Sequence, residues 1–326
     1  MATPFPRPKT SDAARTAEAM TGSSLMPGRA SDANLDVYVD CASAFPKQNF
    51  YILRRALDTL AAAGLRYRIL DRASPERCGG AAIVHVDLTE VPETLLPRAG
   101  AYPICLNGEA KSIHRHLYSS ARIDRDSAYP GPVIVKTVLN HRGLPELRYL
   151  CRTDRLFRWR YRLDRLLGGP INLAHCPEYK LYPSRESVPD SVWGDERMIV
   201  ERFLPGSMSL PVVKYRYDFF LDVTLHTRAV YDSLLCEHTK VREVSLVDGV
   251  PDAVMRVRRD LHLDFGSIDY FLVAGEPVVV DANKTTTCTE DWVSRFPAVS
   301  RYLRDVGGRL VEVVRNGWTH HSATAI

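Results

Sequence analysis

The stretch GSIDYFLVAGEPVVVDANKTTT, residues 266–287, carries acidic and amide side chains at spacings that suit metal binding. Asp281 and Asn283 lie two residues apart on a predicted strand, so their side chains point to the same face. If the turn between the two strands covers the three residues 274–276, Asp269 on the first strand falls opposite Asp281. A slip of one residue would place the two carboxylates on opposite faces of the sheet.

Two carboxylates that face each other across a sheet repel, and a hard cation removes that repulsion. Mg²⁺ takes carboxylate oxygens and keeps other positions for waters and substrate phosphates. Asp269, Asp281 and Asn283 therefore predict a magnesium site that leaves room for a triphosphate. The alternative is a surface hairpin with solvated acids. The valines at 278–280 favour the metal site, because they predict a buried strand from which Asp281 emerges.

This hairpin resembles the metal-binding hairpin of the ATP-grasp proteins, which include D-alanine–D-alanine ligase, glutathione synthetase and the ribosomal-protein glutamate ligases. The resemblance lies in the motif VVVDANKT and in the aspartate of SIDY, twelve residues before Asp281. It implies that Asp269, Asp281 and Asn283 hold the magnesium that bridges the phosphates. The cofactors that it implies are ATP and Mg²⁺.

Two upstream segments match the order of parts that the family leads us to expect. GPVIVKT resembles the buried strand whose lysine, here Lys136, contacts the phosphates. MIVERFLPG resembles the hinge strand, with Glu201 as the acid that reads adenine and with Phe203 and Leu204 presenting backbone groups to the purine. Taken alone, each segment also fits an ordinary strand: an edge strand with a protective lysine, or a strand that ends in a turn.

The chain departs from the family pattern at two places, and a third place leaves two interpretations open. Many carboxylate ligases carry an arginine two residues before the first metal acid, where this chain has Ser267, and Arg216 is the predicted catalytic substitute. The loop 140–146 has one glycine, so a backbone cradle for phosphate is less assured. Lys111 in NGEAKSI resembles the early phosphate lysine of the family, or is a solvated lysine at the start of a helix.

The resemblance implies an ATP-dependent ligase that activates a carboxylate as an acyl phosphate and joins it to an amine. An ATP-grasp phosphotransferase is the alternative that Ser267 favours. A non-catalytic nucleotide-binding protein is the third hypothesis, which the intact set Asp269, Asp281 and Asn283 disfavours. The carboxylate and amine substrates could be small molecules or peptides, because the substrate loops carry no motif that decides between them.

The elements around these residues predict an α/β (α+β) chain. Alternating or continuous apolar residues predict strands at 35–39, 66–70, 81–86, 102–106, 133–135, 198–204, 212–223, 224–230, 268–273 and 277–281. Apolar residues three and four apart predict helices at 50–64, 150–167, 251–261 and 299–313.

These elements group into two units. Residues 34–128 are expected to form a small N-terminal α/β domain with parallel strands, matching the domain that often precedes the ATP grasp. The ATP-grasp domain, with two α+β subdomains that clamp the nucleotide, is expected over 129–317, and its lid subdomain over about 133–203. Residues 1–33 are predicted to be a disordered tail, and residues 318–326 a C-terminal tail.

The composition narrows the class of protein. The formal net charge of +4 is small for 326 residues and argues against a nucleic-acid partner. No apolar run approaches the roughly 18 residues that span a bilayer. The seven cysteines are scattered without a C-x-x-C pair, which favours a reducing cytoplasm over a disulfide framework or zinc site. A homodimer is left open.

The predicted helix over 150–167 has an unusual surface pattern. Its apolar stripe consists of Leu156, Trp159, Leu163 and Leu166. A second stripe, about 100° around the helix, consists of Arg155, Arg158, Arg162 and Arg165. The arginines could receive an acidic substrate, lie on an anionic membrane or form a solvated face with neighbouring aspartates.

Overall fold

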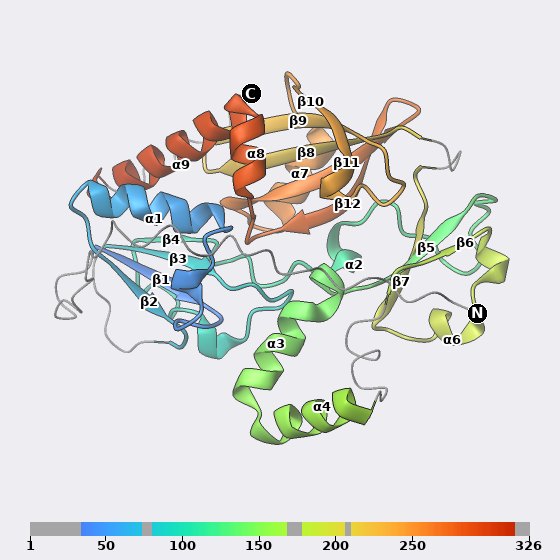
Figure 1. Ribbon diagram of the computed structural model, residues 1–326, viewed down its shortest axis with the longest axis horizontal. Helices are drawn as coiled ribbons and strands as arrows, with labels where there is room; N and C mark the ends of the chain where they lie inside the picture. The colour runs from blue at the N-terminus through green and yellow to red at the C-terminus, as the bar shows by residue number, and fades with distance from the viewer. Residues whose placement is uncertain (1–33, 74–79, 168–177, 206–209, 317–326) are drawn as a thin grey trace, which may run out of the picture.

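The computed structural model describes residues 34–73, 80–167, 178–205 and 210–316. The predicted tails lie outside these ranges. The described residues form three sheets, with helices packed on the outside and one helical arm that extends away from the body (Figure 1). The α/β (α+β) prediction is confirmed, because one sheet is parallel and the other two are antiparallel.

The N-terminal sheet has four parallel strands in the order β2 (Tyr67–Leu70), β1 (Leu35–Val39), β3 (Ala81–His85), β4 (Ile104–Leu106). Every residue of β1 and β3 is buried, as expected for central strands of a covered parallel sheet. The helix α1 (Ile52–Ala62) begins two residues later than predicted, so Phe50 lies outside it and is 42% exposed. Tyr51 precedes the helix with an extended backbone and pairs in a β-bridge with Thr287.

The second sheet is antiparallel and has the order β6 (Lys180–Tyr182), β5 (Val133–Thr137), β7 (Met198–Arg202). All three strands fall inside the segment predicted as a lid. In the register of this sheet Ile134 lies opposite Glu201 and Lys136 opposite Ile199. Short helices flank the sheet: α2 (Arg115–Tyr118) and α6 (Asp190–Trp193).

The central sheet is antiparallel and has the order β10 (Val241–Leu246), β9 (Val223–Tyr231), β8 (Val212–Phe220), β11 (Phe265–Val273), β12 (Glu276–Asn283). The prediction of one strand over 212–223 is wrong at its end. The strand stops at Phe220, because Leu221 adopts a positive φ of 56° and the chain reverses into β9.

In the hairpin of β11 and β12, Asp269 pairs with Asp281 as predicted, but the turn is shorter than predicted and the strand contains a bulge. The turn has two residues, Ala274 and Gly275, both at positive φ, and Val273 pairs with Glu276. That register alone would pair Asp269 with residue 280. A bulge between Asp269 and Tyr270 shifts the ladder by one residue, so Asp269 lies opposite Asp281.

Three C-terminal helices complete the fold: α7 (Asp252–Asp260), α8 (Glu290–Arg295) and α9 (Pro297–Asn316). The predicted apolar stripe of α9 is confirmed, since Val299, Leu303, Val306, Leu310 and Val313 are all buried. This stripe shares one core with α1, the N-terminal sheet and the ends of β8 and β11. Figure 1 shows α9 lying beside α1, so the helix fastens the N-terminal sheet to the central sheet.

The predicted helix over 150–167 is two helices, α3 (Leu144–Thr153) and α4 (Arg155–Leu167), which we call the projecting arm (Figure 1). Asp154 breaks the helix with an extended backbone, and its carboxylate accepts a hydrogen bond from the Phe157 amide at 2.9 Å. No residue of α4 is buried. The prediction of an apolar stripe is therefore correct in position, but the stripe faces outward.

The remaining short elements are 3₁₀ turns at Phe45–Lys47, Glu93–Leu95, Asn140–Gly143, Arg185–Ser187 and His238–Lys240. Across the described ranges, no helix combines the length and apolar character that crossing a bilayer requires.

Candidate functional site

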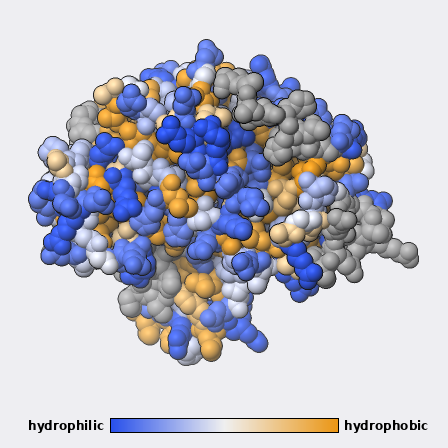
Figure 2. All heavy atoms as spheres, turned by 180° about the vertical axis from the view of Figure 1, so that it is seen from behind, coloured by the Kyte–Doolittle hydropathy of each residue, from blue (hydrophilic) through white to orange (hydrophobic). Residues whose placement is uncertain are grey.

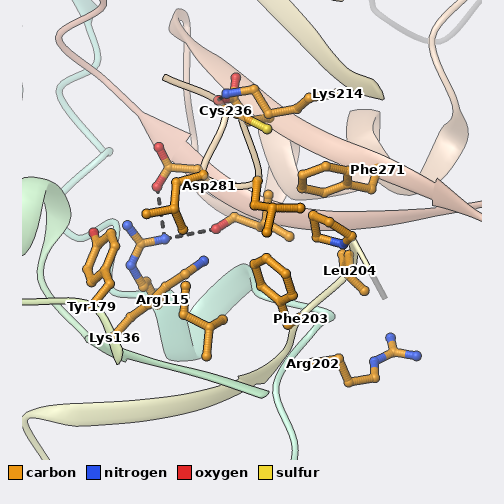
Figure 3. A pocket seen from close by; sticks show the side chains of 16 residues that line it. Arg115, Lys136, Tyr179, Arg202, Phe203, Leu204, Lys214, Cys236, Phe271 and Asp281 are labelled. Atoms are coloured by element: carbon orange, nitrogen blue, oxygen red, sulfur yellow. Dashed lines mark hydrogen bonds and ion pairs between the residues drawn. The ribbon is translucent and has the colours of Figure 1, made fainter. Parts of the chain in front are cut away.

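A pocket with a cavity volume of about 190 Å³ lies between the central sheet and the sheet of β6, β5 and β7, which we call the lid sheet after its place in the predicted lid segment (Figure 3). The lid side contributes β5, the strand β7 and the residues that follow it, and the central sheet contributes β8, β11 and β12. We call it the inter-sheet pocket. Its lining consists of Arg115, Ile134, Lys136, Tyr179, Arg202, Phe203, Leu204, Pro205, Lys214, Leu234, Leu235, Cys236, Asp269, Phe271, Val280 and Asp281.

Two predicted metal ligands, Asp269 and Asp281, line this pocket from neighbouring strands. Asp269 is buried, and the Lys214 ammonium lies 2.6 Å from its carboxylate. The Asp281 side chain is 33% exposed, and the Arg115 guanidinium lies 2.9 Å from it. Figure 3 shows Arg115 reaching toward Asp281 from the lid side. Each carboxylate therefore meets a cation in the pocket.

Asn283 lies on the same strand, two residues beyond Asp281, and is buried. Its amide oxygen accepts hydrogen bonds from the Thr285 amide at 2.9 Å and from the Thr285 hydroxyl at 3.1 Å. It is absent from the pocket lining. Among the described residues no three His, Cys, Asp or Glu side chains form a group that could hold a metal ion. A magnesium ion here would need Asp269, Asp281 and further oxygens from an amide, water or phosphate, which is a ligand set that suits Mg²⁺.

The polar residues that follow Asn283 do not open into the pocket, although the sequence suggested a site there. Lys284, Thr285 and Thr286 are almost completely buried against the N-terminal domain. The Thr285 hydroxyl donates to Asp87 at 2.7 Å. Burial lowers the pKa of Lys284 to about 7, with Asp87 acting in the opposite direction. This segment joins the N-terminal sheet to the hairpin.

Lys136, the predicted phosphate lysine, lines the pocket and forms an ion pair with Glu201. The ammonium lies 2.6 Å from the Glu201 carboxylate, which is completely buried and also accepts a hydrogen bond from Ser119 at 2.6 Å. Burial alone would raise the pKa of Glu201, but the charges of Lys136 and Arg115 lower it. Glu201 is therefore an ionised partner of Lys136 and does not itself line the pocket.

The predicted hinge residues Phe203 and Leu204 line the pocket together with Pro205. The Phe203 amide donates to the Pro132 carbonyl at 2.9 Å, so this donor is already used within the lid. Facing the hinge across the pocket are Leu234, Leu235 and Cys236, from a loop without a recognisable motif. Burial raises the pKa of the Cys236 thiol to about 11, which keeps it neutral.

Arg216 lies on β8 directly opposite Asp269 and next to Ser267. Its guanidinium contacts the Asp218 carboxylate at 2.9 Å, Asp269 at 3.4 Å and the Ser267 hydroxyl at 2.9 Å. The strand pairing thus brings a guanidinium to Ser267, the position where the sequence lacks the family arginine. Arg216 borders the pocket through Asp269 and is absent from its lining.

The structure does not bring Lys111 to the pocket. Lys111 is exposed, and its backbone carbonyl accepts a hydrogen bond from Val91. Arg115, four residues later, is 4% exposed and donates to the Val280 carbonyl at 2.8 Å inside the site. No residue of the loop 140–146 lines the pocket. The backbone amide of Asn140 donates a hydrogen bond to the Thr89 hydroxyl.

Among the pocket residues that the sequence did not single out are Arg115, Tyr179 and Lys214. Lys214 had a usable signal, because it lies two residues before Arg216 on a predicted strand and so shares its face. Although burial opposes it, the Asp269 carboxylate raises the pKa of Lys214, which therefore stays charged. Arg115 and Tyr179 come from segments whose sequence carries no such signal.

The pocket combines an apolar slot with a charged end. Phe203, Leu204 and Phe271 supply apolar walls. Lys136, Arg115 and Lys214 supply positive charge next to two carboxylates, as a cluster of phosphate oxygens and a divalent cation would require. The cavity is smaller than the roughly 300–1,000 Å³ usual for ligand sites.

Comparison with known proteins gives likeness in fold only. No family model matches the chain, and no curated protein matches its sequence. A RimK domain ATP-grasp protein from Sphaerobacter thermophilus is 14% identical, with a TM-score of 0.43 over 86% of this chain and 98% of that chain. The macrocyclase MdnC from Microcystis aeruginosa, bound with precursor peptide MdnA, is 9% identical, with a TM-score of 0.43 over 87% and 100%.

A D-alanine–D-alanine ligase from Bacillus anthracis, complexed with ATP, is 11% identical, with a TM-score of 0.40 over 87% of this chain and 98% of that chain. At these identities the likeness concerns the fold and not the substrates. The solved structures that this chain is similar to in fold are ATP-grasp proteins.

Proposed function

We propose that the inter-sheet pocket binds Mg-ATP and that the protein is a carboxylate–amine ligase. The observation that carries the proposal is the pair Asp269 and Asp281, which the bulge places in cross-strand register. Arg115 of α2 lies beside Asp281, and Lys214 of β8 lies beside Asp269. Two carboxylates on adjacent strands are costly unless cations balance them, and the same arrangement suits a magnesium ion that arrives with a nucleotide.

In this proposal the purine lies in the apolar slot by Phe203 and Leu204, and the phosphates lie by Lys136 and Arg115. Asp269, Asp281 and Asn283 would hold magnesium, whose chemistry is to neutralise phosphate charge. Glu201 keeps the Lys136 ammonium at the end of a rigid strand, where it acts as a point charge for phosphate. The lid and the central sheet would thus hold the nucleotide from two sides.

The reaction that fits this arrangement has two steps. A carboxylate oxygen of the substrate attacks the γ-phosphorus, and the bond to the β-phosphate oxygen breaks, leaving ADP and an acyl phosphate. The nitrogen of an amine then attacks the acyl carbon, and inorganic phosphate leaves while the nitrogen loses a proton. The protein contributes mainly by positioning the reactants and by compensating negative charge.

Arg216 supports the ligase over the phosphotransferase. The absence of an arginine at Ser267 favoured the phosphotransferase, but the Arg216 guanidinium lies 2.9 Å from the Ser267 hydroxyl. A positive charge therefore lies next to the carboxylate pair, where an acyl intermediate needs it. The assay with different carboxylates and amines distinguishes small-molecule substrates from peptide substrates.

The test is ATP binding by calorimetry, with and without Mg²⁺, followed by assays of ADP and phosphate release with pools of carboxylates and amines. Asp281→Ala should weaken Mg-ATP binding by at least about 10-fold, because a lost ligand costs more than a lost supporting contact. Asp291→Ala, which removes an exposed acid on α8, is the matched control and should leave binding unchanged.

The products separate the hypotheses. ADP and free phosphate that require both an acid and an amine would support the ligase. ADP with the phosphate retained on an acceptor would identify a phosphotransferase. Tight Mg-ATP binding without turnover across the pools would favour a nucleotide-binding protein without catalysis, and absence of ATP binding would refute the proposal.

A further inference from the structure

The helix α4 at the tip of the projecting arm presents large apolar side chains to solvent. None of its residues is buried. The exposed fractions are 74% for Leu156, 65% for Trp159, 42% for Leu163, 84% for Leu166 and 76% for Leu167. At 100° per residue these five side chains fall within an arc of about 100°. Figure 2 shows orange, apolar spheres gathered among blue ones on the lobe that projects from the body.

Arginines border this arc on both sides. Arg155 lies next to Leu166 on one edge of the arc, and Arg160 lies next to Leu167 on the other edge, as the helical angles require. Five arginines and one aspartate give α4 a formal charge of +4. The whole chain also has a net charge of +4, so the remainder of the chain is formally neutral. Nearly all of the excess positive charge thus lies on one exposed apolar helix.

We propose that α4 docks on an anionic lipid surface, with its apolar arc inserted between headgroups and its arginines paired with lipid phosphates. An amphipathic helix with tryptophan and leucine on one face and arginines around it is suited to this interface. Arginine stems extend along the apolar layer while their guanidinium groups stay at headgroup level. Arginines on both edges match a surface that extends to both sides of the helix.

The charges argue against occupants from the chain itself. None of the segments 1–33, 74–79, 168–177, 206–209 and 317–326 carries a net negative charge. A second copy would bring the same +4 helix, or a remainder without net charge. The partner must therefore be anionic and of another kind.

The shape favours a lipid surface over an acidic peptide. A single helix at the tip of an arm presents a convex surface. A site that binds an amphipathic peptide helix is commonly a hydrophobic groove, which a convex surface does not provide. The projecting arm carries α4 away from the sheets (Figure 1), and none of its residues is buried. Docking there would hold the inter-sheet pocket close to a membrane without any spanning segment.

The experiment is flotation of the full chain with vesicles of phosphatidylcholine alone or mixed with phosphatidylglycerol. Binding should require phosphatidylglycerol and should weaken at high salt, because headgroup attraction is screened. Arg155→Gln together with Arg160→Gln should reduce partitioning by roughly 30-fold, since each arginine at an anionic surface contributes roughly 5-fold. Trp159→Gln should also reduce binding without changing the thermal unfolding midpoint, because the side chain is 65% exposed.

The matched control is Arg301→Gln with Arg304→Gln, which removes two exposed arginines from α9 and should leave binding unchanged. Equal binding to neutral and anionic vesicles, or an equal loss in this control, would overturn the proposal. Absence of vesicle binding, with an acidic amphipathic peptide bound through Trp159 instead, would assign the face to a protein partner. Self-association that Trp159→Gln abolishes would assign it to a second copy.

Discussion

Asp269 and Asp281 lie opposite each other on β11 and β12 because a two-residue turn and a bulge compensate each other. The turn alone would set Asp269 against residue 280 and point the two carboxylates to different faces. The bulge adds the missing residue next to the site. Bulges commonly re-aim side chains at functional sites, and here the irregularity creates the acidic pair.

The buried pair of Lys136 and Glu201 can be separated from nucleotide binding by a double variant. Lys136→Met leaves the completely buried Glu201 carboxylate without its cation and should cost about 3–5 kcal/mol of unfolding free energy. Adding Glu201→Gln removes the uncompensated charge and should restore most of that loss. ATP affinity should stay low in both variants, because the phosphate-facing ammonium is absent. Denaturant unfolding and calorimetry give the two readouts. Equal stability of the single and double variants would contradict the pairing.

The same pair predicts a pH dependence. The folded-state pKa of Glu201 is lowered, with Lys136 and Arg115 overcoming the effect of burial. Its contribution to stability is therefore present above the unfolded value near 4.5 and is lost as pH falls through the folded value. The stability difference between the wild type and Lys136→Met/Glu201→Gln should narrow as the pH falls below about 4.5. Burial raises the pKa of Asp218, so Asp218 changes stability with pH in the opposite sense. Both proteins contain Asp218, so the difference between them isolates the effect of Glu201. A constant difference from neutral pH down to pH values well below the unfolded pKa would contradict this prediction.

Arg216→Lys should separate nucleotide binding from chemistry. A lysine keeps the charge but cannot contact the Asp218 carboxylate, Asp269 and Ser267 together, as the forked guanidinium does. We expect Mg-ATP affinity to change little and product formation to fall by roughly 100-fold, the usual effect of removing one donor to developing charge. Arg228→Lys on the neighbouring strand β9 is the matched control, since Arg228 pairs at 3.8 Å with the half-exposed Glu243. Unchanged ligation in Arg216→Lys would remove Arg216 from the catalytic role.

In the turn of the hairpin, Ala274 has a strained backbone conformation that a substitution can relieve. Ala274 has a φ of 51° and Gly275 a φ of 86°, the signs of a type I′ turn, for which Asn-Gly is the favoured pair. Ala274→Asn should raise the unfolding free energy by about 0.5–1 kcal/mol, because asparagine tolerates this region better than alanine. Gly275→Ala should lower it by about 1 kcal/mol for the converse reason. Urea unfolding measures both, and changes of the same sign would show that the turn geometry is different.

Several features could be predicted from local sequence because local physics determines them. The pairing of Asp269 with Asp281 was expected from a three-residue turn, and the structure reaches the same pairing with a two-residue turn and a bulge. Lys136 lies near the end of a strand that is apolar in sequence. The spacing of Val299, Leu303 and Val306 was enough to expect the buried face of α9.

Tertiary structure decided the rest, because those contacts join segments that are far apart in the chain. Arg115 reaches Asp281 across 166 residues, and Lys214 meets Asp269 only because β8 pairs with β11. The same strand pairing places the Arg216 guanidinium next to the Ser267 hydroxyl. The serine alone does not indicate from the sequence that an arginine lies beside it. The sequence placed an apolar stripe on the helix that contains α4, and nothing described in the structure covers that stripe. Periodicity determines which side chains share a face, but the packing of other elements determines whether that face meets protein, ligand or solvent.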